Sequence, residues 1–239
     1  MTFELSAPQQ AARDKARVFA TESLAPRAQD IDRASAVPAE IARESRELLE
    51  SCADAVATVA VLEEIAVASG AVAVAAAAGS NKSAQQAGLS GLRGAALPED
   101  SPRAQLWLAA VALGVGRAAL EQALADIRGA AATAHAGSEK PHWVIADAAT
   151  ELDAARLMTR AAAQAIDQTD ASMAVAIARL MASAAARVTV DAALRIIGPD
   201  GYREGTLLER LSRDVRALGV LMGTEERHRA TAAEGLLPG

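Results

Sequence analysis

The side chains that could do chemistry are few and stand apart in this sequence. The three histidines, His135, His142 and His228, have neither an i, i+4 partner nor the spacing of metal ligands. No serine lies in a Gly-x-Ser-x-Gly motif, so a nucleophile elbow is not indicated. Cys52 is the single cysteine and excludes an internal disulfide. We therefore predict no metal site, and we expect the histidines to lie at the surface or at helix caps.

The charged residues near the C-terminus favour structural roles. Thr224 precedes Glu225 and Glu226, an order that is typical of a helix N-cap followed by an acidic first turn. The two glutamates could instead be displaced catalytic bases, and the sequence leaves both readings open. Arg213 and Asp214 are expected to form a structural ion pair rather than a ligand clamp.

Helices must position these residues. Alanine, the best helix former, supplies 63 of the 239 residues, and aromatic residues make up only 2%. This composition predicts an all-α protein. The net charge is −6, and the sequence has no cluster of basic residues of the kind that binds nucleic acid. The N-terminus shows no secretory signal and the apolar run Ala71–Ala78 is too short to span a membrane, so we expect a cytoplasmic protein that binds neither nucleic acid nor membrane.

Hydrophobic periodicity and helix-ending residues divide the chain into three parts. Residues 1–79 form an N-terminal helical part, residues 80–102 a Gly- and Pro-rich linker, and residues 103–239 a bundle of antiparallel helices. The predicted helices are one from a Ser6–Gln9 capping box to before Pro26, one after Pro38, and others over Ala53–Gly79, Arg103–Ala134, Pro141–Gln168, Ala171–Ile197, Glu204–Ala217 and Thr224–Leu236. Gly114-Val-Gly116 follows no strand, so it indicates close helix packing rather than a dinucleotide loop.

Several short motifs follow one another in the order of a known family. They are Phe3-Glu-Leu-Ser-Ala-Pro-Gln-Gln, Arg17-Val-Phe-Ala20, Leu24-Ala-Pro-Arg27, Glu40-Ile-Ala-Arg-Glu, Val61-Leu-Glu-Glu-Ile-Ala66, Leu113-Gly-Val-Gly-Arg-Ala-Ala-Leu-Glu121, Glu151-Leu-Asp-Ala-Ala-Arg156, Arg187-Val-Thr-Val-Asp-Ala-Ala-Leu-Arg-Ile-Ile-Gly198, Glu209-Arg-Leu-Ser-Arg-Asp214 and Gly223-Thr224. In this order they resemble the acyl-CoA dehydrogenases, which are flavoproteins. The resemblance implies that family's helical N-terminal part and C-terminal bundle.

Two departures from the family concern catalysis. The family carries a β domain between its helical parts, and the linker 80–102 that stands in its place is far too short for a barrel. The family's base is a glutamate directly before the Gly-Thr at the last helix entrance, a position that here holds Met222. Some members place this glutamate on the first bundle helix, where this chain has Ala104-Gln-Leu-Trp107. Methionine cannot accept a proton, so we predict no catalytic residue of the family's kind.

Residues that would meet FAD are only partly kept. The family's Arg and Phe-Gly motif is reduced to Arg128, and its Gly-Gly turn, which meets the flavin across a subunit interface, is half kept between Gly198 and Gly201. The resemblance assigns cofactor contacts to Arg128, Gly198, Gly201, Thr224 and Glu226. We therefore expect FAD only together with a partner subunit, and otherwise no cofactor.

Three functions follow from this reading, in decreasing preference. The first is a subunit of a hetero-oligomeric, flavin-dependent acyl-thioester dehydrogenase, inactive alone, whose full-length partner supplies the β domain and the base. The second is a non-redox protein on the same scaffold, either a lyase or cyclase or a binder of acyl-CoA or carrier-protein thioesters. The third is a structural homo-oligomer. Fold alone does not decide among them.

The missing β domain raises two structural expectations. A ligand groove, with Trp107 at its rim, could open between the helices over Ala53–Gly79 and Arg103–Ala134; alternatively, Leu106, Leu113 and Ala71–Ala78 fill that space by direct packing. The helices over Pro141–Ile197 are also expected to present apolar surface that forms a dimer or tetramer interface.

Overall fold

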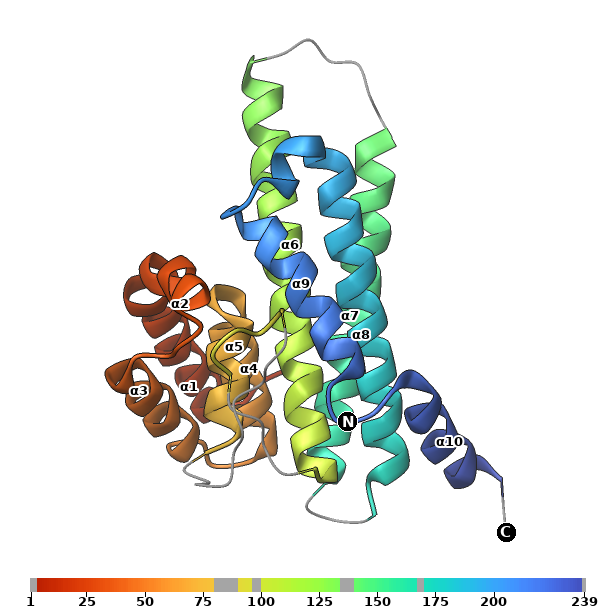
Figure 1. Cartoon of the computed structure of the whole chain (residues 1–239). Helices are drawn as coiled ribbons and strands as arrows, with labels where there is room; N and C mark the ends of the chain where they lie inside the picture. The colour runs from red at the N-terminus through yellow and green to blue at the C-terminus, as the bar shows by residue number, and fades with distance from the viewer. Residues whose placement is uncertain (1–3, 80–89, 96–99, 134–139, 167–169, 238–239) are drawn as a thin grey trace.

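The computed structural model describes residues 4–79, 90–95, 100–133, 140–166 and 170–237, which form helices and turns without a strand (Figure 1). The all-α prediction is therefore confirmed for this part of the chain. The elements in order are α1 (Ala7–Val18), the π-helix η1 (Phe19–Leu24), the 3₁₀-helix η2 (Ala25–Arg27), α2 (Ala28–Ala34), α3 (Ala39–Glu50), α4 (Ala55–Ala68), α5 (Gly70–Ala77), α6 (Pro102–Thr133), α7 (Lys140–Ala165), α8 (Ser172–Ile197), the 3₁₀-helix η3 (Gly198–Tyr202), α9 (Leu207–Val220) and α10 (Glu225–Leu236).

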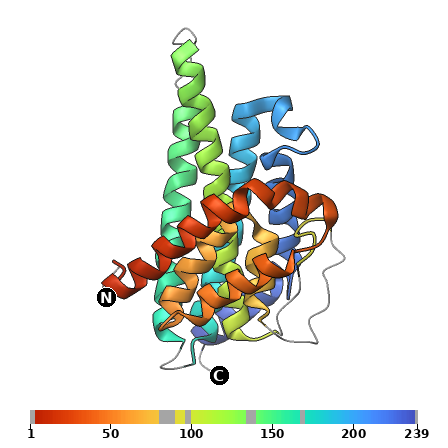
Figure 2. The ribbon, with the colours of Figure 1, turned by 90° about the vertical axis from the view of Figure 1, so that its left-hand side faces the viewer.

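The N-terminal helices form a layer against one side of the bundle, and α1 crosses over α4 (Figure 2). The predicted capping box starts α1, because the Ser6 N–H donates to Gln9 Oε1 at 2.9 Å. Gln9 Nε2 also donates to Asp54 Oδ2 at 2.9 Å, and Asp54 caps α4. One polar side chain thus joins the starts of two helices. The α-helix ends at Val18 and continues as η1 and η2, so the predicted single helix up to Pro26 changes its winding along the way.

The single helix predicted over Ala53–Gly79 is wrong, because the chain breaks at Ser69. This residue has extended backbone angles (φ −156°, ψ 112°), and its hydroxyl accepts the Val72 N–H at 3.4 Å to cap α5. At Gly70 an added Cβ would lie 3.1 Å from side-chain atoms of both Leu92 and Val115. The break therefore falls where the chain has both a capping side chain and a crowded position that suits glycine.

The C-terminal helices form the predicted bundle. Successive helices α6, α7, α8 and α9 run up and down beside one another, and α10 packs against α8 (Figure 1). By length and composition α6 and α8 would each suffice to cross a membrane, but 67% and 50% of their apolar stretches are buried inside the protein. They are the core helices of the bundle, and core helices pass the same test.

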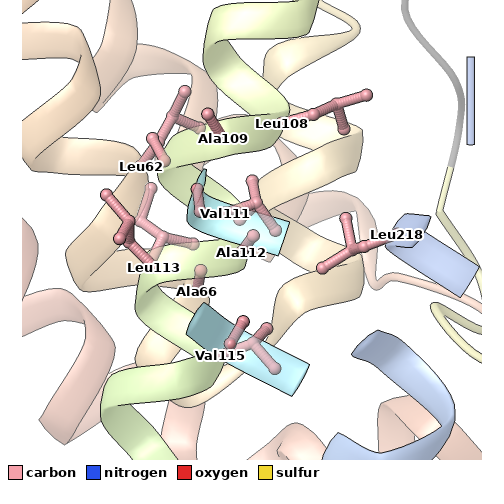
Figure 3. Packing of buried hydrophobic residues seen from close by; sticks show 14 of the residues in the cluster. Leu62, Ala66, Leu108, Ala109, Val111, Ala112, Leu113, Val115 and Leu218 are labelled. Carbon is pink, nitrogen blue, oxygen red and sulfur yellow. The ribbon is translucent and has the colours of Figure 1, made fainter. Parts of the chain in front are cut away.

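The space predicted as a groove is filled along the contact of α4 and α6 (Figure 3). A Cβ on Gly114 would lie 2.4 Å from the Glu63 carbonyl oxygen and 2.5 Å from the Ala66 Cβ, so only glycine permits this approach. Leu106 and Leu113 are fully buried in the same core. The alternative of direct helix packing is confirmed, and so is the interpretation of the two glycines in α6 as packing residues.

Candidate functional site

Met222, which stands where the resemblance expects a catalytic glutamate, and the stretch Ala104–Trp107, which is the alternative location, meet at one corner of the bundle. Gln105 on α6 donates through Nε2 to the backbone oxygen of Met222, at 2.6 Å, in the turn between α9 and α10. Met222 has a left-handed backbone (φ 60°), and its half-buried side chain packs against the hydrophobic core. We call this place the Gln105–Met222 corner. Neither residue carries a carboxylate that could remove a proton.

Asp100 is the carboxylate that this corner does hold, and it is already engaged. Its Oδ1 accepts from Gln105 at 2.8 Å, and its Oδ2 accepts from Arg227 at 2.7 Å. Burial by itself would raise the pKa of Asp100, but these two hydrogen bonds outweigh burial and lower it. The group therefore stays ionised and acts as a structural acceptor.

Glu225 and Glu226 occupy the first turn of α10, as the structural reading predicted. Glu225 pairs with Arg187 at 3.2 Å and with Arg229 at 2.7 Å. Glu226 is exposed, and a hydrogen bond with Thr224 lowers its pKa. Thr224 stands at the N-cap position, yet its side chain does not bond to a helix N–H. These contacts assign both glutamates to the helix start.

The expectation that His228 lies at the surface or at a helix cap is wrong, because His228 is a buried residue within α10. His228 is only 7% exposed, and its Nε2 has no hydrogen-bond partner among the residues that the structure describes, as is also true of the buried Gln105 Oε1. Burial and the nearby Arg179 and Arg227 lower the pKa of His228, so its imidazole is neutral at pH 7. Both His228 and Gln105 help to line a cavity of about 280 Å³, whose full lining is Asp100, Ser101, Pro102, Gln105, Ser172, Val175, Ala176, Arg227, His228 and Thr231. The side chains of His135 and His142 lie outside the described residues.

The residues expected to contact FAD do not form one site within this chain. Arg128 is exposed near the end of α6, at the end of the bundle where η3 carries Gly198 and Gly201. Thr224 and Glu226 lie beside the start of α6, where Gln105 bonds to Met222. At about 1.5 Å per helical residue, the two ends of α6 at Gln105 and Arg128 are roughly 35 Å apart. A single flavin in one chain cannot touch both sets.

Arg213 and Asp214 have structural roles, but not with each other as predicted. Arg213 pairs with Asp32 at 2.7 Å and with Glu209 at 2.6 Å. Asp214 is buried, and its Oδ1 accepts the Leu92 N–H at 2.7 Å. Burial raises the pKa of Asp214 to about 6. Neighbours in sequence on a helix point in different directions, which explains the separate partners.

The sequence analysis missed a buried ionic cluster centred on Glu63 and Glu64 of α4, which are 3% and 2% exposed. Arg117 of α6 bonds to both glutamates, Arg156 of α7 bonds to Glu63 at 3.0 Å, and Arg17 of α1 bonds to Glu64 at 3.0 Å. Burial would raise the pKa of Glu64, but the bonds from Arg117 and Arg17 lower it. Two adjacent glutamates in an otherwise apolar helix were the signal that could have indicated partners.

Comparison with known proteins identifies the family to which these helices belong. Residues 103–237 match the family model for the acyl-CoA dehydrogenase C-terminal domain. The chain is 36% identical over 98 residues to cyclohex-1-ene-1-carbonyl-CoA dehydrogenase of Geobacter metallireducens (40% of this chain, 26% of that protein). It is 35% identical over 131 residues to 3-sulfinopropanoyl-CoA desulfinase of Paraburkholderia xenovorans (54% and 34%). The matched part thus spans about a third or less of these relatives.

Solved structures agree with the fold over a longer span. Butyryl-CoA dehydrogenase from Megasphaera elsdenii superposes with a TM-score of 0.84 at 16% identity, covering 100% of both chains. A glutaryl-coenzyme A dehydrogenase in complex with glutaryl-CoA superposes with a TM-score of 0.80 at 16% identity, covering 98% of this chain and 96% of the other. At such low identity these matches establish the fold alone.

Proposed function

The chain belongs to the acyl-CoA dehydrogenase family, and from this premise we propose that it is a helical subunit of a hetero-oligomeric, flavin-dependent acyl-thioester dehydrogenase that is inactive alone. A full-length family member supplies the β domain and the catalytic base. This chain supplies a bundle face and flavin contacts across the subunit interface.

The observation that carries the proposal is the chemistry of the Gln105–Met222 corner. Met222 and the stretch Ala104–Trp107, where the resemblance expects the base, lie next to each other, and neither holds a carboxylate. Asp100 cannot replace the base easily, because Gln105 and Arg227 already occupy its oxygens and lower its pKa. A chain that keeps the scaffold without a proton acceptor at either position needs the acceptor from elsewhere.

The separation of the flavin-contact residues supports a role in an oligomer. FAD, when bound, would supply the oxidising group for dehydrogenation. Gly198, Gly201 and Arg128 at one end of the bundle would meet a flavin held by a partner, whereas Thr224 and Glu226 at the other end would meet a second flavin. In such an arrangement, residues at both ends of the bundle contact a flavin. One flavin bound within a single chain could not reach both ends.

Apolar side chains on α7 and α8 support association through the C-terminal helices. Trp143 is 70% exposed, and Leu157 and Val188 are exposed as well. Half-buried Ile177 and Met181 continue the apolar surface along α8. Exposed apolar surface of this kind is typical of protein interfaces, so we propose a dimer or tetramer formed by these helices.

A second candidate is a non-redox enzyme or binder acting on acyl thioesters. One relative in the comparison is a desulfinase by name, which indicates that this family includes proteins named for reactions other than dehydrogenation. Such a reaction would not require the missing glutamate. The two candidates differ in whether a flavin accompanies the chain.

Co-expression with a full-length homologue tests the first candidate. The chain purified alone should be colourless and should not reduce a dye acceptor with acyl-CoA substrates. The co-purified complex should carry flavin and turn over. Met222→Glu in the chain alone should not restore turnover, because the β domain would still be missing. Dye reduction by the purified homomer at ordinary enzyme rates would contradict the proposal; a colourless complex that converts acyl thioesters would favour the second candidate.

A further inference from the structure

The guanidinium of Arg179 on α8 is a buried cation that no carboxylate balances within the part of the chain that the structure describes. The residue is 1% exposed, and burial alone lowers its pKa to about 10, so the group stays charged at pH 7. A buried charge is unfavourable unless hydrogen bonds compensate it. The hydrogen-bond partners of Arg179 therefore indicate its role.

These partners are mainly backbone carbonyls at the end of α9. Nη2 of Arg179 donates to the oxygens of Leu218 and Leu221, the latter at 3.4 Å. Its Nη1 donates to the hydroxyl of Ser183. Leu218 belongs to the last turn of α9, where carbonyls lack helix partners and carry the negative end of the helix dipole. The end of a helix, rather than an acid, thus compensates the charge.

The segment 221–224 joins α9 to α10, and donors from three helices hold it; we call it the α9–α10 turn. Besides the bond from Arg179, the oxygen of Met222 accepts from Gln105 of α6 at 2.6 Å. The same oxygen accepts from Arg227 of α10 at 3.2 Å. Met222 has a φ of 60°, a left-handed conformation that is unfavourable for residues other than glycine. Side chains from outside the turn therefore hold its backbone in a conformation that its own sequence does not favour.

We propose that Arg179 is a positioning residue, which fixes the α9–α10 turn and thereby the placement of Thr224 and Glu226. This inference rests on the proposed function, in which these two residues contact a flavin. Thr224 is the last residue of the turn, and Glu226 hydrogen-bonds with it in the first turn of α10. A turn that moved would carry both side chains with it. Arg179 is buried, so it acts on them through the backbone of the turn.

NMR of methionine methyl groups tests the hold on the turn in the chain alone, because Met222 is one of five methionines. Met222→Leu assigns its signal. We expect Arg179→Leu to shift or split the Met222 signal, since the turn loses one of its donors, and to leave the signal of Met158 on α7 unchanged. Arg179→Lys keeps a charged donor and should restore the signal. Arg179→Gln repeats the test with a smaller change if Arg179→Leu does not fold.

Ser183→Ala is the matched control. It removes a partner of Arg179 but none of the bonds to the turn, and it should leave the Met222 signal in place.

The affinity of the co-purified complex for FAD tests the consequence for Thr224 and Glu226. We expect Arg179→Leu to weaken FAD binding at least about 10-fold, and Arg179→Lys to restore it to within about 3-fold of the wild type. Leu152→Ala, at a fully buried position of α7, controls for general destabilisation and should change the affinity by less than about 2-fold.

The inference is overturned if the Met222 signal stays in place in a folded Arg179→Leu or Arg179→Gln chain. It is also overturned if Arg179→Leu and Leu152→Ala weaken FAD binding equally, because the effect would then be one of stability. A wild-type complex without flavin would instead contradict the proposed function, and the NMR result would still decide whether Arg179 holds the turn.

Discussion

The Glu63–Glu64 cluster and the Gln105–Met222 corner both involve helix α6. The cluster is held by buried charged side chains, whereas the two residues that define the corner are neutral. In the cluster, two buried carboxylates are matched by arginines from α1, α6 and α7. At the corner, Gln105 and Met222 are neutral, and two buried polar atoms, Gln105 Oε1 and His228 Nε2, have no hydrogen-bond partner in the part of the chain that the structure describes. Buried charges join the helices in the cluster, whereas neutral side chains do so at the corner.

This difference indicates which interactions the chain needs in order to fold. Removing one member of a buried ion network leaves the others uncompensated, so the cluster must stay complete for the fold to form. The neutral side chains of Gln105 and Met222 make no such demand. Met222 packs against the core without an ionic partner. The comparison therefore separates a region whose charges the fold requires from one in which packing and hydrogen bonds suffice.

Breaking the cluster should have the largest effect. Arg117→Ala leaves Glu63 and Glu64 buried with only one arginine each, and we expect a loss of about 3–5 kcal/mol in the free energy of unfolding. Urea denaturation measures it. The matched control Arg27→Ala removes an arginine from an exposed pair with Glu40 and should cost less than about 1 kcal/mol. Equal losses in the two variants would mean that the cluster is no more important than a surface pair.

Placing a charge at the corner should have the next largest effect. Gln105→Glu removes the donor to Met222 and Asp100 and buries a second carboxylate beside Asp100, at an expected cost of about 3 kcal/mol at pH 7. The introduced carboxyl has its pKa raised in the fold, so the loss should shrink as the pH falls toward 4. Gln105→Met, the control, should cost about 1–2 kcal/mol with no such pH dependence. A fully stable Gln105→Glu variant would contradict the view that position 105 requires a neutral hydrogen-bond donor.

The contact that joins the two regions depends on Gly114. Gly114→Ala places a Cβ 2.4 Å from the Glu63 carbonyl oxygen, so α4 must move away from α6, and we expect a loss of about 2 kcal/mol. Gly129→Ala is the control in the same helix: its Cβ would meet no atom within 4 Å, and better helix propensity should add up to about 1 kcal/mol. Thermal unfolding measures both. A Gly114→Ala variant as stable as Gly129→Ala would show that the close packing is not required.

Local sequence patterns predicted the helices. The features that these patterns missed depend on contacts between residues far apart in the sequence. The alanine content and the helical spacing were sufficient for the all-α class and the bundle, because both depend on residues near one another in sequence. The arginines that bind Glu63 and Glu64 lie 47 to 93 residues away, beyond any local pattern. The break at Ser69 likewise depends on Leu92 and Val115.

His228 provides the smallest and most specific test of the corner. Its folded pKa lies below the ordinary value of about 6.5, mainly through burial and then through Arg179 and Arg227, while Asp100 opposes them. The unfolded chain therefore binds more protons, so the stability that neutral His228 allows is fully present above pH 6.5 and is lost as the pH falls below it. His228→Gln should weaken this fall between pH 7 and pH 5, measured as urea midpoints along a pH series. If the His228→Gln curve ran parallel to that of the wild type, the imidazole would not be held neutral by its surroundings, and this site would tolerate an imidazolium.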